Sequence, residues 1–234
     1  MSLLKDIAEL IIPPTCPVCG RLLFEGERMF CVDCMADMPL THYSEQADNP
    51  MFRRFWGIVP IERATALIYF VKNSGWQRAI HSFKYDGAWR IALECGYMIG
   101  GELLDSNLFY DIDVIVPVPL HISKLIRRGY NQSAYIAKGI AEVYEAKLSL
   151  NNLVRVRNNA SQAQRTYLER WQNVSGIFKV RHPERFEGKH ILLVDDVFTT
   201  GATLIACAEA LLASCKDIRI SVATLAIAQD NYPE

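Results

Sequence analysis

The sequence predicts an α/β fold in which helices flank a mainly parallel sheet, with a small zinc ribbon at the N-terminus. The aliphatic run at 191–194 has the unbroken apolar character of a strand that is buried on both faces, and the mainly apolar stretches at 64–71 and 112–116 are also expected to form strands. Segments with helical periodicity separate these runs, which specifies right-handed βαβ units and a parallel sheet. Two C-x-x-C pairs lie before the first strand and indicate a separate metal module.

The metal module contains the pairs Cys16/Cys19 and Cys31/Cys34, with eleven residues between them. Four thiolates complete the tetrahedral coordination of zinc and leave no open position, which favours a structural site. The alternative is a thioredoxin-like redox pair, which requires a C-x-x-C inside a βαβ pattern, and both pairs precede any such pattern. A ribbon of this size has too small a core to fold without its metal.

Length and composition describe one full domain with a small appendage. The chain has 234 residues and a net charge of −1, and this balance predicts neither nucleic-acid nor membrane binding. The apolar residues of 1–12 are interrupted by Lys5, Asp6 and Glu9, so we expect a short amphipathic docking helix and no membrane span. Without a signal peptide, we expect a cytoplasmic protein with reduced cysteines.

These patterns divide the chain into three parts. We expect an N-terminal helix and zinc ribbon at 1–45, a linker at 46–58, and the α/β domain at 59–234. In that domain, helices at 76–83 and 89–104 follow the first strand, and the strand 112–116 comes next.

A proline-rich loop follows the strand 112–116. It consists of Pro117, Val118, Pro119, Leu120 and His121. Prolines make this loop stiff. Lys124, Arg127 and Arg128 come next, before a helix at about 133–147, and a rigid loop followed by cations suits a diphosphate. The alternative is a solvated basic face of a helix.

A polar stretch follows the next expected strand, which covers 148–154. Residues 155–165 include Arg155, Arg157 and Gln162 and lack any apolar period. Long loops inside compact domains are often lids over a binding site, so we expect residues 155–165 to shield a bound ligand from water.

The strongest motif covers residues 191–203. Its strand ends at Asp195 and Asp196, and a turn then opens a helix that leads to a last strand at 218–225. The turn consists of Thr199, Thr200, Gly201, Ala202 and Thr203. Unpaired N–H groups and the helix dipole hold phosphate at such a turn, while carboxylates accept hydrogen bonds from ribose hydroxyls. The alternative is an ordinary strand-to-helix turn with an exposed acidic pair.

Residues 191–203 resemble the motif with which type I phosphoribosyltransferases bind 5-phosphoribosyl 1-diphosphate (PRPP) together with magnesium. The whole chain is similar to the ComF/GntX family, because the four-cysteine ribbon, Lys84–Gly87, Pro117–His121, Arg128–Gln132, the 155–165 loop and the PRPP motif follow in the same order. The resemblance implies a type I phosphoribosyltransferase fold.

The resemblance also implies roles for individual residues. Asp195 and Asp196 would contact the ribose at the catalytic centre, and Thr199–Thr203 the 5-phosphate. Residues Pro117–His121, together with Lys124, would contact the diphosphate. Arg155, Arg157 and Gln162 would lie on the mobile hood loop, where Asn159 and Arg165 depart from the family's usual Thr and Leu.

Two kinds of function follow from the resemblance. The first is a PRPP-binding phosphoribosyltransferase-like protein that transfers or senses phosphoribosyl groups, has an unknown acceptor, and is linked to DNA uptake, competence or the use of extracellular DNA. The alternative is a non-catalytic factor that binds single-stranded DNA, or adapts a DNA-uptake helicase or channel, under regulation by PRPP. The groups available to DNA are the cations Arg53, Arg54, Lys124, Arg127 and Arg128 and the aromatic residues Trp56 and Tyr130.

Overall fold

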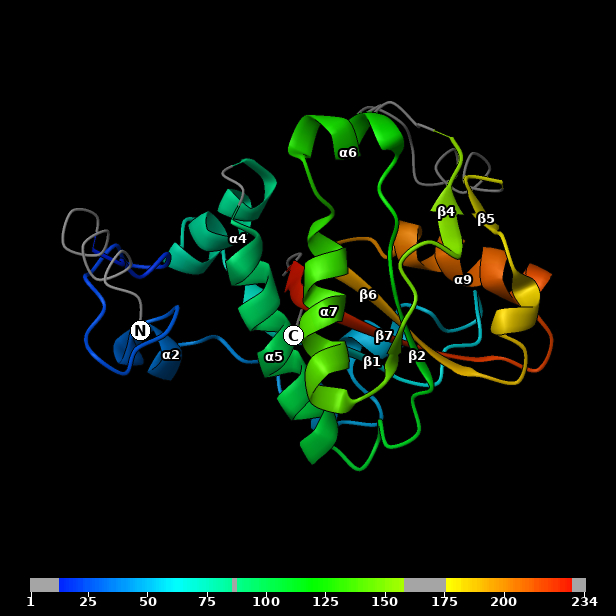
Figure 1. Ribbon diagram of the computed structural model, residues 1–234. Coiled ribbons are helices and arrows are strands. Elements are labelled where there is room, and N and C mark those ends of the chain that lie inside the picture. The colour runs from blue at the N-terminus through cyan, green and yellow to red at the C-terminus, as the bar shows by residue number, and fades with distance from the viewer. Residues whose placement is uncertain (1–12, 86–87, 158–175, 229–234) are drawn as a thin grey trace.

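A five-stranded parallel sheet forms the centre of the protein (Figure 1). The computed structural model describes residues 13–85, 88–157 and 176–228. The strand order is β1-β7-β6-β2-β3. The strands are β1 (Ala64–Phe70), β2 (Val114–Pro117), β3 (Lys147–Leu148), β6 (His190–Phe198) and β7 (Arg219–Ala228). The predicted parallel sheet is confirmed, and its strands all end at one edge, which we call the carboxyl edge.

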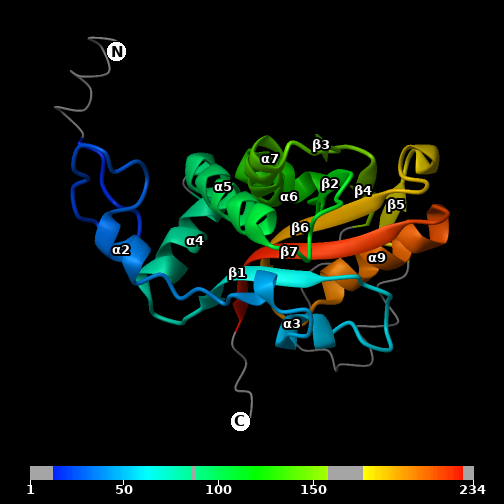
Figure 2. The same cartoon turned by 90° about the horizontal axis from the view of Figure 1, so that it is seen from below.

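Helices cover both faces of the sheet, as Figure 2 shows. The helices α5 (Trp89–Asp105) and α7 (Gln132–Tyr144) cover one face, with α4 (Gly75–Tyr85) beside α5. The helices α9 (Ala202–Ser214) and α3 (Pro50–Arg53) cover the other. Each face therefore has its own layer of buried apolar side chains.

The backbones of α5 and α7 touch at two glycines. A Cβ atom on Gly96 would lie 2.3 Å from the carbonyl oxygen of Ile136, and one on Gly139 would lie 2.3 Å from that of Leu93. Only glycine permits so close an approach. This contact fixes the position of α7 over the sheet.

The strand expected at 148–154 is wrong in extent, because the chain changes sheets within it. After β3 it turns and enters β4 (Leu153–Arg155), which pairs antiparallel with β5 (Phe178–Val180). The buried side chain of Asn152 makes this turn. Its Oδ1 accepts from the His182 N–H at 2.7 Å, and its Nδ2 donates to the His182 carbonyl at 2.9 Å.

Residues 39–58 pack against the sheet. Met51 and Phe55 are fully buried, and Asn49 both caps α3 and donates to the carbonyl of Ala64 at 2.9 Å. Residues 39–41 form backbone hydrogen bonds with β1. The Thr41 N–H donates to the carbonyl of Leu67, and the Tyr69 N–H donates to the carbonyl of Pro39. It thereby covers the outer edge of β1. The domain boundaries at 45 and 58 stay a prediction.

In the three described ranges, no helix combines the length and the apolar character needed to cross a bilayer. The expected amphipathic helix at 1–12 lies outside the described residues.

A buried histidine joins strands at the edge of the sheet where the strands begin. His190 is 2% exposed, and its Nδ1 lies 2.7 Å from Asp111 Oδ1 while its Nε2 lies 2.9 Å from Ser221 Oγ. The guanidinium of Arg219 lies 2.6 Å from the other oxygen of Asp111. Partial burial raises the pKa of Asp111, but the hydrogen bonds from Arg219 and His190 outweigh this effect and hold the pKa below its usual value.

We expect Asp111→Ala to lower the free energy of unfolding at pH 7 by about 1–3 kcal/mol, because it leaves the buried His190 Nδ1–H without its acceptor. The carboxylate stabilises the fold above its ordinary pKa, and this contribution disappears as the pH falls through the lower native value. Urea unfolding from pH 7 to 3 should therefore show the two proteins converging in acid. A constant difference at all pH values would contradict the ionic origin.

Candidate functional site

The acidic pair lies on β6, near its carboxyl end. Asp195 Oδ1 accepts hydrogen bonds from Ser133 Oγ at 2.8 Å and from the Asp196 N–H at 2.9 Å. Asp196 Oδ1 accepts from the Val197 N–H at 2.8 Å. Both carboxylates are only partly buried. The pair is therefore held in a defined orientation while still reaching the surface.

The threonine-rich turn opens α9 directly after β6. Gly201 is its N-cap residue, and the first turn of α9 contains no acidic side chain that would occupy the positive end of the helix. Thr199, Thr200 and Thr203 are exposed around a concavity of about 30 Å³ that Asp195 also lines. Hydroxyl and N–H donors thus surround a space that suits an anion.

Gly201 requires glycine for two reasons. Its φ is +77°, a left-handed conformation that other residues adopt with strain. A Cβ atom there would also lie 2.9 Å from Cζ of Phe198, whose ring packs 5.7 Å from that of Phe55. The turn therefore rests on a buried aromatic pair.

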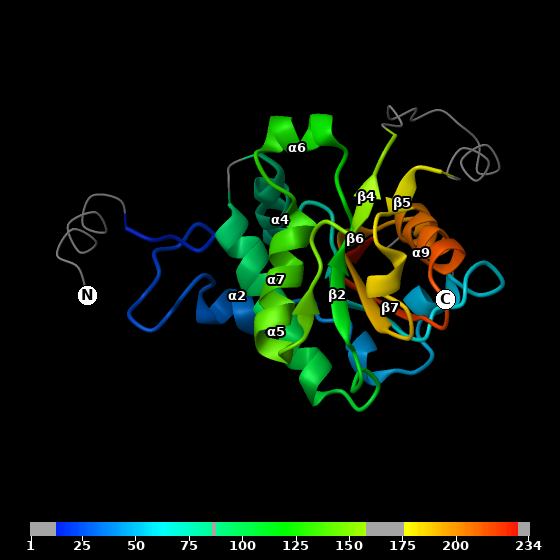
Figure 3. The ribbon, with the colours of Figure 1, turned by 45° about the vertical axis from the view of Figure 1, so that its right-hand side comes forward.

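The proline-rich loop lies beside the acidic pair. Pro117 pairs with Val194 in the sheet, and the Val118 N–H donates to the Val194 carbonyl at 2.8 Å. Figure 3 shows how β2 leads through this loop to α6 (Ile122–Arg128), beyond the carboxyl edge. The loop and the acidic pair follow residues that are direct neighbours in the sheet, Pro117 and Val194.

His121 caps α6. Its Nδ1 accepts from the Ser123 N–H at 3.3 Å and lies 2.9 Å from Ser123 Oγ. This contact gives His121 a structural task in starting the helix. Lys124, Arg127 and Arg128 follow on α6, so cations stand next to the loop.

Only part of the expected hood loop lies within the described residues. Arg155 ends β4, where its guanidinium stands 5.6 Å from the ring centroid of Phe178 and its Nε donates to the carbonyl of Arg157 at 3.3 Å. Gln162, Asn159 and Arg165 lie outside the described residues. The hood assignments stay predictions.

The four cysteines of the N-terminal module come together. The sulfur atoms of Cys16, Cys19, Cys31 and Cys34 all lie within 4.8 Å of one another. The Cys34 N–H donates to Cys31 Sγ, and this hydrogen bond, together with weaker ones from the other three thiols, lowers the pKa of Cys31 to about 7. Four cysteine sulfur atoms this close together can bind a metal ion such as zinc.

An aromatic contact attaches this module to the α/β domain. Phe30 packs against Trp76 of α4, with 4.9 Å between ring centroids. At the start of α4, a Cβ on Gly75 would lie 2.4 Å from the carbonyl oxygen of Val18. The module and the helix are therefore in backbone contact.

Two of the groups considered for DNA binding are already engaged. The guanidinium of Arg53 forms two hydrogen bonds of 2.7 Å with Asp48, and Arg128 Nη1 donates to Gln132 Oε1 at 3.1 Å. Trp56 is 56% exposed, and Arg53 lies 5.9 Å from the centre of its ring. The charge of Arg53 is thus balanced within the protein.

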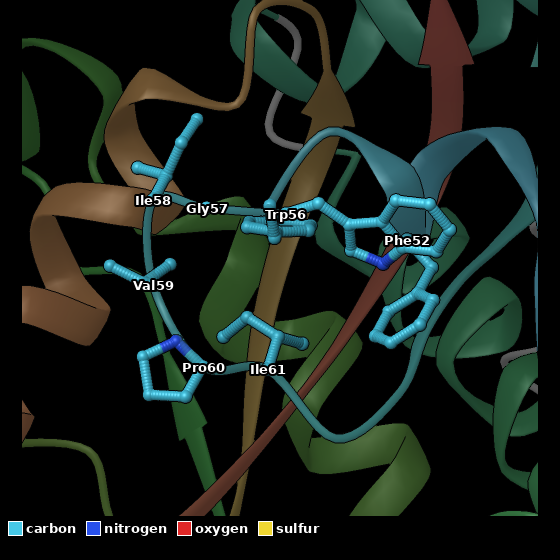
Figure 4. Close-up of a pocket in the computed structure, with 8 residues that line it drawn as sticks. Phe52, Trp56, Gly57, Ile58, Val59, Pro60 and Ile61 are labelled. Carbon is cyan, nitrogen blue, oxygen red and sulfur yellow. The ribbon is translucent and has the colours of Figure 1, made fainter.

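A larger cavity of about 410 Å³, whose lining contains neither Asp195 nor Asp196, was not predicted from the sequence (Figure 4). Its lining consists of Phe52, Phe55, Trp56, Gly57, Ile58, Val59, Pro60 and Ile61. No side chain in this lining is charged. The aromatic and aliphatic residues at 52–61 are the only sequence signal of this cavity, and those at 52–58 lie in the expected linker.

Comparison with known proteins matches residues 130–233 to the phosphoribosyl transferase domain. The DNA utilization protein YhgH of Escherichia coli (strain K12) is 26% identical over 200 residues, which cover 84% of this chain and 83% of that protein. Competence protein F of Haemophilus influenzae is 35% identical over 94 residues, covering 39% and 41% of the two chains. Competence protein ComFC of Bacillus subtilis is 35% identical over 112 residues, covering 48% and 43%.

We expect Gly201→Ala to destabilise the protein by about 1–3 kcal/mol, because it adds backbone strain and a contact with Phe198. Gly188→Ala is the matched control, since Gly188 also has positive φ but has nothing within 4 Å of the added Cβ. Thermal unfolding of both variants separates strain from crowding. Equal losses would show that the contact with Phe198 has no cost.

We expect the purified protein to contain one metal ion per chain and Cys31→Ser to lose it, because three remaining thiolates no longer complete a closed site. Metal content measured by mass spectrometry tests this. Cys215→Ala, which removes a buried cysteine outside the cluster, is the control and should keep the metal. Full metal content in Cys31→Ser would refute the assignment.

Proposed function

We propose that this chain, a ComF-like member of the phosphoribosyltransferase family with the type I fold, binds PRPP at the carboxyl edge of β2 and β6. One observation carries the proposal. The acidic pair near the end of β6, the threonine-rich turn after β6 and the proline-rich loop at the end of the neighbouring strand β2 lie at one edge of the sheet. Ligands of α/β sheets bind at this edge.

Each part of PRPP has a chemical counterpart in this arrangement. The 5-phosphate takes the donors of Thr199–Thr203 at the start of α9, and the ribose hydroxyls donate to Asp195 and Asp196. The diphosphate takes the loop Pro117–His121, and the ammonium group of Lys124 compensates its charge. The partial burial of both carboxylates is compatible with contact to a ligand.

Magnesium fits the same set of residues. The ion prefers oxygen ligands and uses one or two carboxylates together with the phosphates of a substrate, and Asp195 and Asp196 supply carboxylate oxygens here. When bound, magnesium reduces the negative charge on the departing diphosphate.

The residues of the chain then act by binding and orientation. The donors at the two ends of the ligand hold the ribose between them, so that its C1 faces an incoming nucleophile. The carboxylates of Asp195 and Asp196 favour the positive charge that develops on the sugar ring as the bond to diphosphate breaks. No covalent bond to the protein is needed.

The acceptor is open, and a sensor of PRPP without transfer is the second candidate. The names of three relatives connect them with DNA utilization or competence, and we propose that this chain serves the same process. Direct binding of single-stranded DNA is the less favoured proposal, because Asp48 already balances the charge of Arg53.

We propose zinc as the ion of the cysteine cluster, with a structural role. Four sulfur ligands leave no open coordination position for a substrate. Such a site needs reduced thiols, which supports a cytoplasmic location.

We expect the double variant Asp195→Ala, Asp196→Ala to weaken PRPP binding at least about 100-fold, since two charged acceptors for ribose hydroxyls are lost. Isothermal calorimetry with magnesium present measures this. Glu209→Ala, which removes one exposed carboxylate from α9 outside the acidic pair, is the control and should bind as the wild type does. Unchanged affinity in the double variant would end the proposal.

Release of diphosphate distinguishes the enzyme from the sensor. We expect the protein with PRPP, magnesium and a panel of bases and amines to release diphosphate with one acceptor. Binding of PRPP without release by any acceptor would favour the sensor.

A further inference from the structure

The first turn of α7 touches both halves of the proposed PRPP site. Ser133, which is 3% exposed, donates from Oγ to Asp195 Oδ1 at 2.8 Å. Two residues earlier, Asn131 donates from Nδ2 to the carbonyl of Val118 at 2.9 Å. Val118 belongs to the proline-rich loop, so one turn of helix links the acidic pair with the loop.

The side chain of Asn131 bonds to Val118 and does not cap α7. It occupies the N-cap position of α7, where an asparagine normally accepts a hydrogen bond from the helix backbone, but its side chain makes no such bond. Its Oδ1 is buried and accepts no hydrogen bond from the part of the chain that the structure describes. A buried polar atom left in this way needs an explanation, and holding the loop supplies one.

The surroundings of this turn make it rigid. Gln132 is 1% exposed and accepts from Arg128 Nη1 at 3.1 Å, which braces the turn from the end of α6. The close contact of α5 and α7 at Gly96 and Gly139 holds the helix itself. The short side chains of Asn131 and Ser133 have little conformational freedom on this rigid turn. The position of α7 therefore determines where their hydrogen-bond partners lie.

We infer that Asn131 and Ser133 are positioning residues, which set the proline-rich loop and Asp195 at a fixed separation from the first turn of α7. The inference rests on the proposed function. Asn131 acts on the diphosphate half through the Val118 carbonyl, and Ser133 acts on the ribose half through Asp195. Neither side chain needs to touch the ligand.

Two fragments of PRPP separate the two effects. Inorganic diphosphate reports on the loop, and ribose 5-phosphate reports on the acidic pair. Ser133→Ala removes the hydroxyl that holds Asp195. Asn131→Leu keeps nearly the same shape, adds no charge, and removes the donor to Val118.

We expect a crossed pattern of affinities, measured by calorimetry with magnesium. Ser133→Ala should weaken ribose 5-phosphate about tenfold and change diphosphate less than about twofold, as expected for the loss of a hydrogen bond to a charged group. Asn131→Leu should weaken diphosphate about tenfold and leave ribose 5-phosphate nearly unchanged. Both variants should weaken PRPP.

A control and a second pair of variants keep the test decisive. Ser106→Ala removes another buried hydroxyl, which lies outside the proposed site. This hydroxyl donates to the Ser44 carbonyl and accepts from the Leu108 N–H. It should lose stability without losing affinity. Ser133→Thr keeps the hydroxyl and should bind ribose 5-phosphate as the wild type does. If Ser133→Ala does not fold, the nearly isosteric and weakly donating Ser133→Cys replaces it.

Equal weakening of both fragments by each variant would show a merely structural role and would overturn the inference, as would unchanged affinities. A wild-type protein that binds neither PRPP nor the two fragments would instead overturn the proposed function, and the inference with it.

Discussion

The contact between the backbones of α5 and α7 is the constraint on which the candidate site depends. Gly96 and Gly139 let the two helices approach until only hydrogen atoms fit between them, and a side chain at either position would force them apart. Because interiors are close-packed, such a shift would move α7 over the sheet. The first turn of α7 carries the partners of Asp195 and of Val118, so the spacing of the helices becomes the geometry of the ligand site.

The features that the sequence predicted well are those that depend on local pattern. The aliphatic run before Asp195, the threonine-rich turn and the start of α9 follow from burial and from the chemistry of helix ends, and the structure has them in that order. The close approach of the four cysteine sulfurs also agrees with the spacing of the two pairs. Each of these signals lies within a short stretch of chain.

What the sequence did not predict depends on contacts between distant segments. Nothing near Ser133 indicates that its hydroxyl meets a carboxylate 62 positions later. The split between β3 and β4 depends on the hydrogen bonds between Asn152 and His182. Phe55, which lies in the expected linker, belongs to the core because its ring packs against the ring of Phe198. Contacts between residues that are distant in the sequence determine these features, and the periodicity of the sequence contains no information about such contacts.

The covered outer edge of β1 explains why the residues before the first strand belong with the sheet. Residues 39–41 occupy hydrogen-bonding groups of β1, and Asn49 fills one more. A fragment trimmed to begin at residue 59 would present an open, apolar β-ladder to other molecules, and open ladders recruit further strands. The residues that cover β1 thus also protect the protein against self-aggregation.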